Sequence, residues 1–449
     1  MKKQSFQNNI LLIFLGALLM GMLWRVRGTG GWGSSWGLLN AGVVFLLFLN
    51  TAVNKKTYNS LTLIALSGLS FMLTCPAWGT YLNQITGILS VSPNEEQVIQ
   101  YEINPLSGVI MMLLLGFGLA SVYGIMIGRC FGEHQWRIRD YLFVAVVFIV
   151  VDLAAKATVS HLTLKLIEPQ AVTAFTDGLK AEGIAKSVYA SYMSHFSAVS
   201  WAKKLIGGRN YFSSVGTISL VYAGIASLLA ARFYVKDRYA ARVGTVVCFA
   251  FAFSITISDL FFYFGNGGYH MEQGLTLPSS FAPWSLWEYF TGFLAGGIIT
   301  AFVIYTHPEQ ENKETALDQL PLKFKKALSF IFAVVPGIGL NCVRPLLERI
   351  RDKTVGIIVT VVVSLMIFAA TYLFASKRAF ALSVSDLRRI EPAICLFFVV
   401  YMFIVYMFIG KPEISGIGML HNILLTISAA SVSVYLAYRI HQNRTITIQ

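Results

Sequence analysis

The chain is a succession of long apolar stretches separated by short polar loops. A helix of about twenty apolar residues crosses about 30 Å of hydrocarbon, and most of the stretches approach that length. We therefore expect an all-α polytopic membrane protein with about 12 transmembrane helices. The expected spans are residues 9–24, 36–53, 61–78, 106–128, 141–162, 212–234, 243–264, 284–305, 327–343, 355–374, 393–409 and 417–438.

The first, third and ninth expected spans are short, so one of them could be a re-entrant segment instead of a crossing helix. The N-terminal stretch after Lys2 and Lys3 looks like a signal peptide. However, no small-residue cleavage motif precedes Arg25, and further spans follow directly. We therefore interpret this stretch as an uncleaved first transmembrane helix.

The composition agrees with a membrane location. Hydrophobic residues make up 56% of the chain and charged residues only 13%, with a formal net charge of +13. Basic residues are retained in cytoplasmic loops, and the loops richer in Lys and Arg place both termini in the cytoplasm. We expect an integral protein of a bacterial inner (plasma) membrane whose partners are membrane lipids and a small anionic or polar solute. No pattern supports nucleic-acid binding, so the positive charge indicates orientation and lipid contact.

The five cysteines are scattered in or beside apolar segments, without a Cys-x-x-Cys pair. This spacing indicates neither a disulfide framework nor a zinc site. We therefore expect no metal and no cofactor.

Residues 168–209 form a long segment between the fifth and sixth spans. Apolar residues recur there near helical spacing among lysines and glutamates. That pattern predicts one or two amphipathic helices lying along the outer membrane surface. Such a helix would serve either as a lid over the outer mouth or as a structural interfacial element.

The two halves of the chain show a weak similarity. The first pair of spans and the seventh and eighth spans are each joined by a glycine-rich turn, and each turn is followed by paired tryptophans. This predicts an N-terminal six-helix bundle over 1–236, including the outer segment 168–209, and a C-terminal six-helix bundle over 237–449. A chance match among apolar segments is the alternative.

Two six-helix bundles are similar to the topology of the major facilitator class of secondary transporters. In that class the loop between the second and third spans carries a signature rich in Gly, Asp and Arg. Residues 54–60 here contain neither the acid nor the glycines, so the resemblance is topological. It implies two bundles that face a shared central cavity and alternate its access.

Arg25 and Arg27 follow the first apolar helix and precede a glycine run. A guanidinium offers several donors that match a carboxylate or phosphate, so the pair is a candidate site for an anionic group. Trp32 and Trp36 would line the same substrate-binding region. The alternative is an interfacial arginine pair on lipid headgroups, with Trp24 and the other tryptophans as an aromatic belt.

Three further residues, Trp287, Glu288 and Arg344, are expected at the same outer level and would belong to the same substrate-binding region. Glu288, directly after Trp287 at the start of the eighth span, is a natural partner for Arg25 or Arg27. Its alternative role is a carboxylate that complements the helix dipole. Arg344 belongs to a basic outer segment that would add to a positive mouth and attract an anionic solute, although lipid contact explains it as well.

Three ionisable groups inside spans are candidates for coupling to a proton or ion. Asp259 is a lone carboxylate near the outer end of the seventh span. Asp152 and Lys156 lie four residues apart on one helical face near the middle of the fifth span. The alternatives are a polar helix end for Asp259, and for the pair a mutually neutralising contact between helices.

These features favour a secondary active transporter, and not an enzyme, that moves a small anionic or polar solute by alternating access with proton coupling. No nucleotide-binding loop of the G-x-x-x-x-G-K-[ST] kind is present. A membrane-embedded transferase is the alternative, acting at the outer face on a lipid-linked sugar or acyl donor, with His270 or Glu288 as the general base. The spacing of His270 and Glu272 matches no zinc motif, and the alternative is that they are ordinary loop residues. A non-catalytic membrane scaffold is the third possibility.

Overall fold

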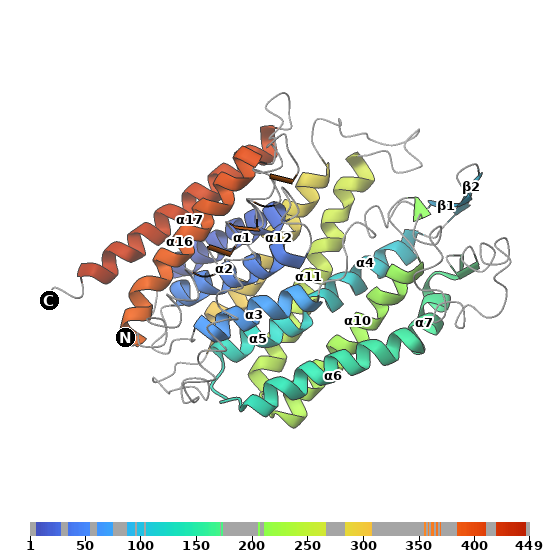
Figure 1. Ribbon diagram of the computed structural model, residues 1–449, viewed down its shortest axis with the longest axis horizontal. Helices are drawn as coiled ribbons and strands as arrows, with labels where there is room; N and C mark the ends of the chain where they lie inside the picture. Colours follow the sequence, from blue (N-terminus) through green and yellow to red (C-terminus); the bar gives the residue numbers. More distant parts are fainter. Residues whose placement is uncertain are drawn as a thin grey trace.

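The chain folds into a predominantly helical structure (Figure 1). The computed structural model describes residues 6–27, 35–53, 61–74, 88–94, 97–102, 105–170, 172–173, 205–206, 211–265, 283–307, 384–409 and 419–445, with single positions between 354 and 369. The helices are α1 (Phe6–Arg27), α2 (Ser35–Val53), α3 (Leu61–Thr74), α4 (Pro105–Leu119), α5 (Ser121–Phe131), α6 (Ile138–Ala157), α7 (Val159–Ile167), α10 (Tyr211–Leu229), the π-helix η2 (Ala230–Tyr234), α11 (Arg238–Gly265), α12 (Pro283–Thr306), α16 (Val384–Ile409) and α17 (Met419–Thr445).

Five of these helices are long and apolar enough to cross a membrane, and the number rises to seven if each of two bent pairs counts as one span. The structure therefore supports a membrane-embedded, polytopic protein. The ninth expected span, 327–343, lies outside the described residues, and the tenth, 355–374, is described only at single positions.

Two expected spans are each broken into a bent pair of helices. The span expected over 106–128 is α4 and α5, bent by 42°, and the span expected over 141–162 is α6 and α7, bent by 61°. At the first bend the hydroxyl of Ser121 donates to the carbonyl of Gly118. Glycine and serine at this point weaken the regular helical hydrogen bonding, which is a common cause of kinks.

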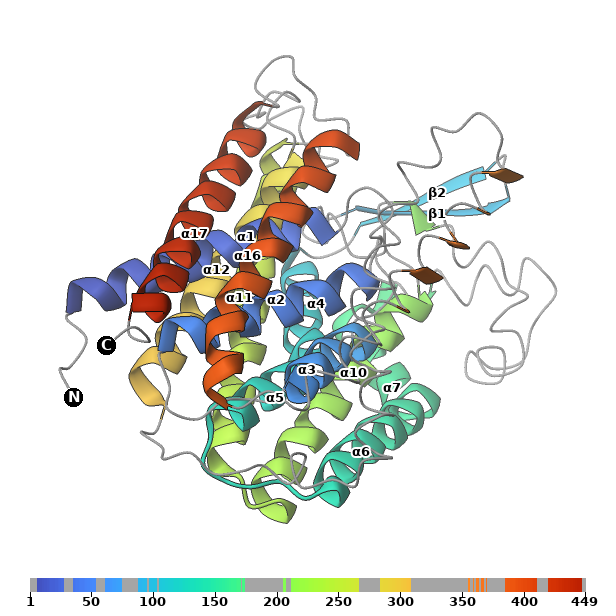
Figure 2. The ribbon, with the colours of Figure 1, turned by 60° about the vertical axis from the view of Figure 1, so that its left-hand side comes forward.

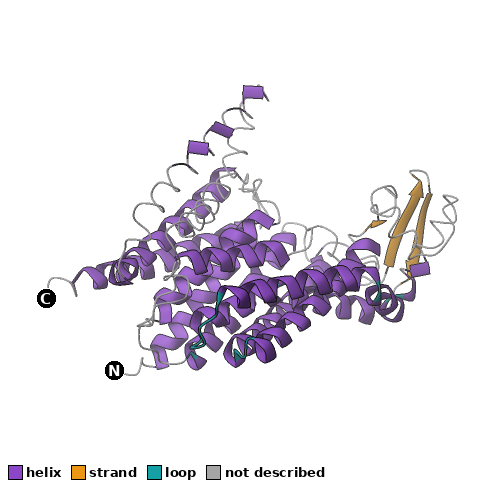
Figure 3. Ribbon diagram, turned by 60° about the horizontal axis from the view of Figure 1, so that its bottom comes forward, coloured by secondary structure: helices purple, strands orange, loops and turns teal. Residues whose placement is uncertain are grey.

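A small antiparallel sheet accompanies the helices and was not predicted from the sequence. Strands β1 (Ile88–Asn94) and β2 (Gln97–Glu102) form a hairpin, and β3 (Leu205–Ile206) pairs with β1, so the strand order is β2-β1-β3. The strands lie beyond one end of the helices (Figure 3). Leu205–Ile206 belongs to the segment expected to be amphipathic helix. Its backbone pairing with β1 takes precedence there over local periodicity, and most of that segment lies outside the described residues.

Helix α1 packs on α12 through glycines. A Cβ at Gly292 would lie 2.2 Å from the carbonyl oxygen of Met20, and one at Gly296 would lie 2.7 Å from the carbonyl oxygen of Gly16. Gly292 and Gly296 are four residues apart, so they lie on one face and let the two backbones approach closely. Helices α5 and α11 meet in a similar way at Gly124 and Gly244.

Helices from both ends of the sequence surround α1. It contacts α2, α12, α16 and α17, while α4 and α5 pack on α11, and α10 packs on α4 and α6. Figures 1 and 2 show α16 and α17 near α1, with α6 and α7 on the far side of the molecule. The division of the chain at residue 236 stays a prediction.

Large apolar side chains cover outward faces of several helices. On α6, Leu142 and Leu153 are each 60% exposed, and on α17 Val434 is 71% exposed. Apolar faces of this extent are costly in water but are compatible with contact to lipid chains. They agree with the membrane location inferred from helix length.

Candidate functional site

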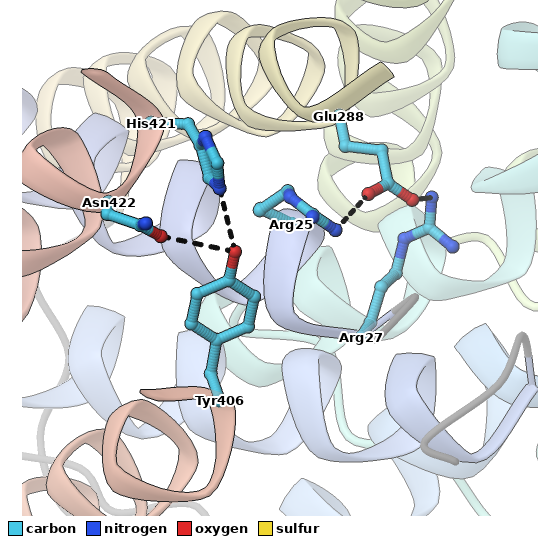
Figure 4. Close-up of polar contacts among 6 residues, drawn as sticks. All are labelled: Arg25, Arg27, Glu288, Tyr406, His421 and Asn422. Carbon is cyan, nitrogen blue, oxygen red and sulfur yellow. Dashed lines mark hydrogen bonds and ion pairs between the residues drawn. The ribbon is translucent and has the colours of Figure 1, made fainter. Parts of the chain in front are cut away.

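The central feature of the site is one carboxylate shared by two arginines (Figure 4). Nη1 of Arg25 donates to Oε2 of Glu288 at 2.8 Å, and Nη2 of Arg27 lies 3.7 Å from Oε1 of the same carboxylate. The side chains are 12%, 1% and 4% exposed for Arg25, Arg27 and Glu288 respectively. The structure thus brings Glu288 together with the arginines for which the sequence analysis suggested it as a partner.

The burial of Arg27 follows from the way α1 ends. The helix continues to Arg27, three residues past the end of the expected span, so both arginines are helical and not in a loop. The guanidinium of Arg27 lies over the Trp24 ring, with Cζ 4.0 Å from the ring centroid, an arrangement that gains cation–π attraction. Gly37 at the start of α2 packs directly on Arg27, because a Cβ there would lie 2.6 Å from the Cβ of Arg27.

A second set of polar side chains lies beside Arg25. Cζ of Arg25 is 5.4 Å from the centroid of the Tyr406 ring. The Tyr406 hydroxyl donates to Oδ1 of Asn422 at 3.4 Å and lies 3.0 Å from Nε2 of His421 (Figure 4). All three side chains are buried. With the hydroxyl proton directed to Asn422, Nε2 of His421 is the donor to Tyr406.

These residues converge because four helices meet at one end of the bundle. The arginines end α1, Glu288 lies in the second turn of α12, Tyr406 is near the end of α16, and His421 and Asn422 are in the first turn of α17. The sequence analysis missed Tyr406, His421 and Asn422. The sequence signal that could have indicated them was the pair of polar residues His421 and Asn422 at the beginning of an apolar helix.

Trp287 packs beside the site, and its expected substrate-binding role stays a prediction. It is 2% exposed and belongs to an apolar cluster with Met112, Leu115 and Ile255. Residue 36 lies in the first turn of α2, but its side chain is outside the described residues, as are residues 32, 270, 272 and 344. The expected roles of Trp32, Trp36, Arg344, His270 and Glu272 therefore stay predictions.

Asp259 is fully buried on α11, next to the buried Ser258. It lies four residues, or about one helical turn, after Ile255, which packs on Trp287. The carboxylate therefore belongs to the part of α11 that packs against the beginning of α12. This places Asp259 in the neighbourhood of Glu288.

Asp152 and Lys156 form a separate local pair. Nζ of Lys156 lies 2.6 Å from Oδ2 of Asp152, and the Ser219 hydroxyl donates to Oδ1 at 2.6 Å. The pair thus connects α6 to α10, and neither helix packs extensively on α1. The structure does not bring these two coupling candidates together with the arginines.

A buried carboxylate at the opposite end of α16 was not considered in the sequence analysis. Glu391 is 1% exposed and accepts a hydrogen bond from Nδ2 of Asn50 on α2 at 3.4 Å. The expected span began at residue 393, whereas α16 begins at Val384 and contains Pro392. Because the expected span began after Glu391, the sequence analysis assigned this residue to a loop, whereas it lies inside α16.

Among the residues that the structure describes, no group of three or more His, Cys, Asp or Glu could hold a metal ion. Comparison of the chain with protein-family models, with curated proteins and with solved structures finds no match.

Proposed function

We propose that this chain is a secondary active transporter that binds a small anion where α1 ends and α12 begins. The observation that carries the proposal is the buried Arg27 and the partly buried Arg25, bridged by the Glu288 carboxylate. Charged groups in a membrane protein are costly to bury, and they commonly mark a substrate or ion pathway.

The chemistry of the arginine pair supports an anion. Each guanidinium presents several N–H donors in a plane, which suits carboxylate and phosphate oxygens. Arg25 already donates to the Glu288 carboxylate and Arg27 forms an ion pair with it, so an incoming anion would compete with Glu288 for the same two partners. The low exposure of both arginines strengthens such an attraction, because little water screens it.

Transport also requires the helices around the site to rearrange. Of the four helices that carry the polar residues, α1 is the common neighbour of α12, α16 and α17. We propose that these helices open and close the site by alternating access. A twelve-span arrangement of two six-helix bundles in a bacterial inner membrane, with both termini cytoplasmic, belongs to this proposal and is supported by the distribution of apolar stretches and basic loops.

The proposal is tested by flux into sealed liposomes containing the purified chain. Lactate, succinate, glutamate, sulfate and inorganic phosphate are each offered down a gradient. We expect arginine-dependent uptake of at least one anion, and Arg27→Ala should reduce it about tenfold or more, as expected when a buried charge-assisted contact of about 1.5–3 kcal/mol is lost.

Arg139→Ala is the matched control. Arg139 is 67% exposed, pairs only loosely with Asp140 at 3.7 Å, and lies at the opposite end of the bundle from the site. It should leave uptake unchanged. Equal uptake by the wild-type chain and the Arg27→Ala variant, or no uptake of any of the five anions, would reject the proposal.

One observation favours the transferase as a second candidate. His421 donates to Tyr406 through Nε2, which leaves Nδ1 as a proton acceptor, and the Tyr406 ring lies beside Arg25, so a proton acceptor and a cation are close together. In this function the arginines hold a diphosphate and His421 serves as the base. Product formed from a lipid-linked donor in detergent, where no gradient exists, and lost in His421→Ala but not in Arg139→Ala, would support the transferase over the transporter.

A further inference from the structure

The carboxylate of Glu288 occupies the position that a substrate anion would need. Its two oxygens contact two different guanidiniums, at 2.8 Å to Arg25 and 3.7 Å to Arg27. A substrate carboxylate would have the same two oxygens to offer to the same donors. The contact between α1 and α12 therefore shows, within the protein, how the arginine pair holds a carboxylate.

The charges around Glu288 constrain how this exchange can occur. Among the described residues, the titratable groups around Glu288 are Arg25 and Arg27 from α1, Tyr406 from α16, His421 from α17, and Asp259 from the part of α11 that packs on α12, whereas α2 has no titratable side chain. With His421 and Tyr406 neutral, the described residues place two cations against two carboxylates, so their summed formal charge is zero.

Adding a monoanion to this buried set would leave one uncompensated negative charge. Such a charge is expensive where water is scarce. If Glu288 binds one proton as the anion enters, the balance is restored, because a neutral carboxylic acid replaces an ionised one. A dianion would need two protons, and Glu288 can take only one.

Glu288 is the carboxylate best placed for this role. It contacts both arginines, so protonation weakens both contacts at once and makes both guanidiniums available to the anion. Asp152 is held by Lys156 on its own helix α6 and by Ser219 on α10, away from the arginines, so its protonation would not alter the arginine pair.

We propose that the transported solute is a small monocarboxylate, and that Glu288 takes up one proton as the solute displaces it from Arg25 and Arg27. The anion and the proton then cross the membrane together. This inference rests on the proposed transporter function and adds the substrate class and the coupling residue.

The first measurement needs no variant. Lactate and propionate are added to the purified full chain in detergent at about pH 8, in weak buffer containing a pH indicator dye, with sulfate as the dianion probe. We expect uptake of about one proton for each monocarboxylate bound. The dissociation constant should then rise about tenfold per pH unit above the titration range of Glu288, because one proton is linked to each anion.

The second measurement compares two Glu-to-Gln variants. In Glu288→Gln the side chain at position 288 is permanently neutral, so lactate should bind without proton uptake, with less than a twofold change in affinity between about pH 6 and pH 8. In liposomes this variant should still exchange lactate but lose accumulation driven by a pH gradient. Glu133→Gln, at an exposed loop position, should behave as wild type in both assays.

The outcomes separate this inference from the proposed function. Arginine-dependent binding of lactate without proton uptake, or proton uptake that survives in Glu288→Gln, would overturn the coupling and leave the transporter proposal standing. Arginine-dependent binding of sulfate but of neither monocarboxylate would overturn the substrate class alone. Absence of arginine-dependent binding and flux for every anion would reject both.

Discussion

Replacing Gly292 by alanine should separate α12 from α1 and thereby disturb the Arg25–Glu288 contact. An added Cβ would lie 2.2 Å from the carbonyl oxygen of Met20 and 2.5 Å from the Cβ of Trp24. An ordinary carbon contact requires about 3.5 Å, so the helices must move apart by roughly 1 Å. Glu288 lies one turn before Gly292, so this shift would lengthen its 2.8 Å contact with Arg25.

The magnitude follows from a matched control on the same helix. A Cβ at Gly297 would meet only the Cβ of Ala17 at 3.4 Å, which is ordinary contact. Both substitutions gain the same helix propensity of about 1 kcal/mol over glycine. Their difference in stability therefore reports the overpacking alone, which we expect to cost about 1–3 kcal/mol.

The assay is thermal unfolding in detergent, followed by the intrinsic fluorescence of tryptophan. The apparent Tm of Gly292→Ala should lie on the order of 2–4 °C or more below that of Gly297→Ala, and binding of the transported anion should weaken only in Gly292→Ala. Equal apparent Tm values for the two variants would refute the close approach of α1 and α12 on which the site geometry depends.

Two further predictions concern the part of the structure away from the site. Asp237 accepts hydrogen bonds from the Trp136 indole and from the backbone of Ala240, both at 2.8 Å. Asp237→Ala should therefore destabilise the fold by about 2 kcal/mol or more, because a helix cap and the partner of a buried indole are lost. In the same unfolding assay, Glu133→Gln at an exposed position should have no effect. Cys130, Cys248 and Cys395 are buried, so the thiols should react with a maleimide only after denaturation; rapid labelling of any of the three in the native protein, measured by mass spectrometry, would contradict the packing.

Much of the helical framework could be predicted from hydropathy. Helix α2 begins one residue before the expected span and ends with it, and α12 agrees to within one residue at each end. A run of apolar residues of membrane-spanning length has few alternatives to a helix, because its backbone groups must be satisfied internally. The hairpin of β1 and β2 was not predicted, because its strands are short and its pairing with β3 joins segments far apart in the chain.

The candidate site was only partly predictable. Arg25, Arg27 and Glu288 were recognisable as charges at span ends, whose placement against lipid is costly. The partners of Arg25 beyond Glu288 were not, since a tyrosine near the end of one apolar helix and a histidine at the start of the next are unremarkable in the sequence. For Asp152 and Lys156 the sequence left open a coupling role or a neutralising contact between helices. The structure shows Lys156 and the Ser219 hydroxyl of α10 both against the Asp152 carboxylate, while the coupling role stays a prediction.

The sequence by itself determined that this chain is a polytopic membrane protein and which charged residues lie at the ends of its helices. Only the tertiary structure decided that α1 packs on α12, which brings Glu288 to Arg25 across 263 positions of the chain. The physical reason is that lipid-facing and helix-facing sides of a transmembrane helix are both apolar, so hydropathy shows where a helix lies but not which neighbour it chooses. That choice is made by the close contact of glycines and by the partners that buried charges require.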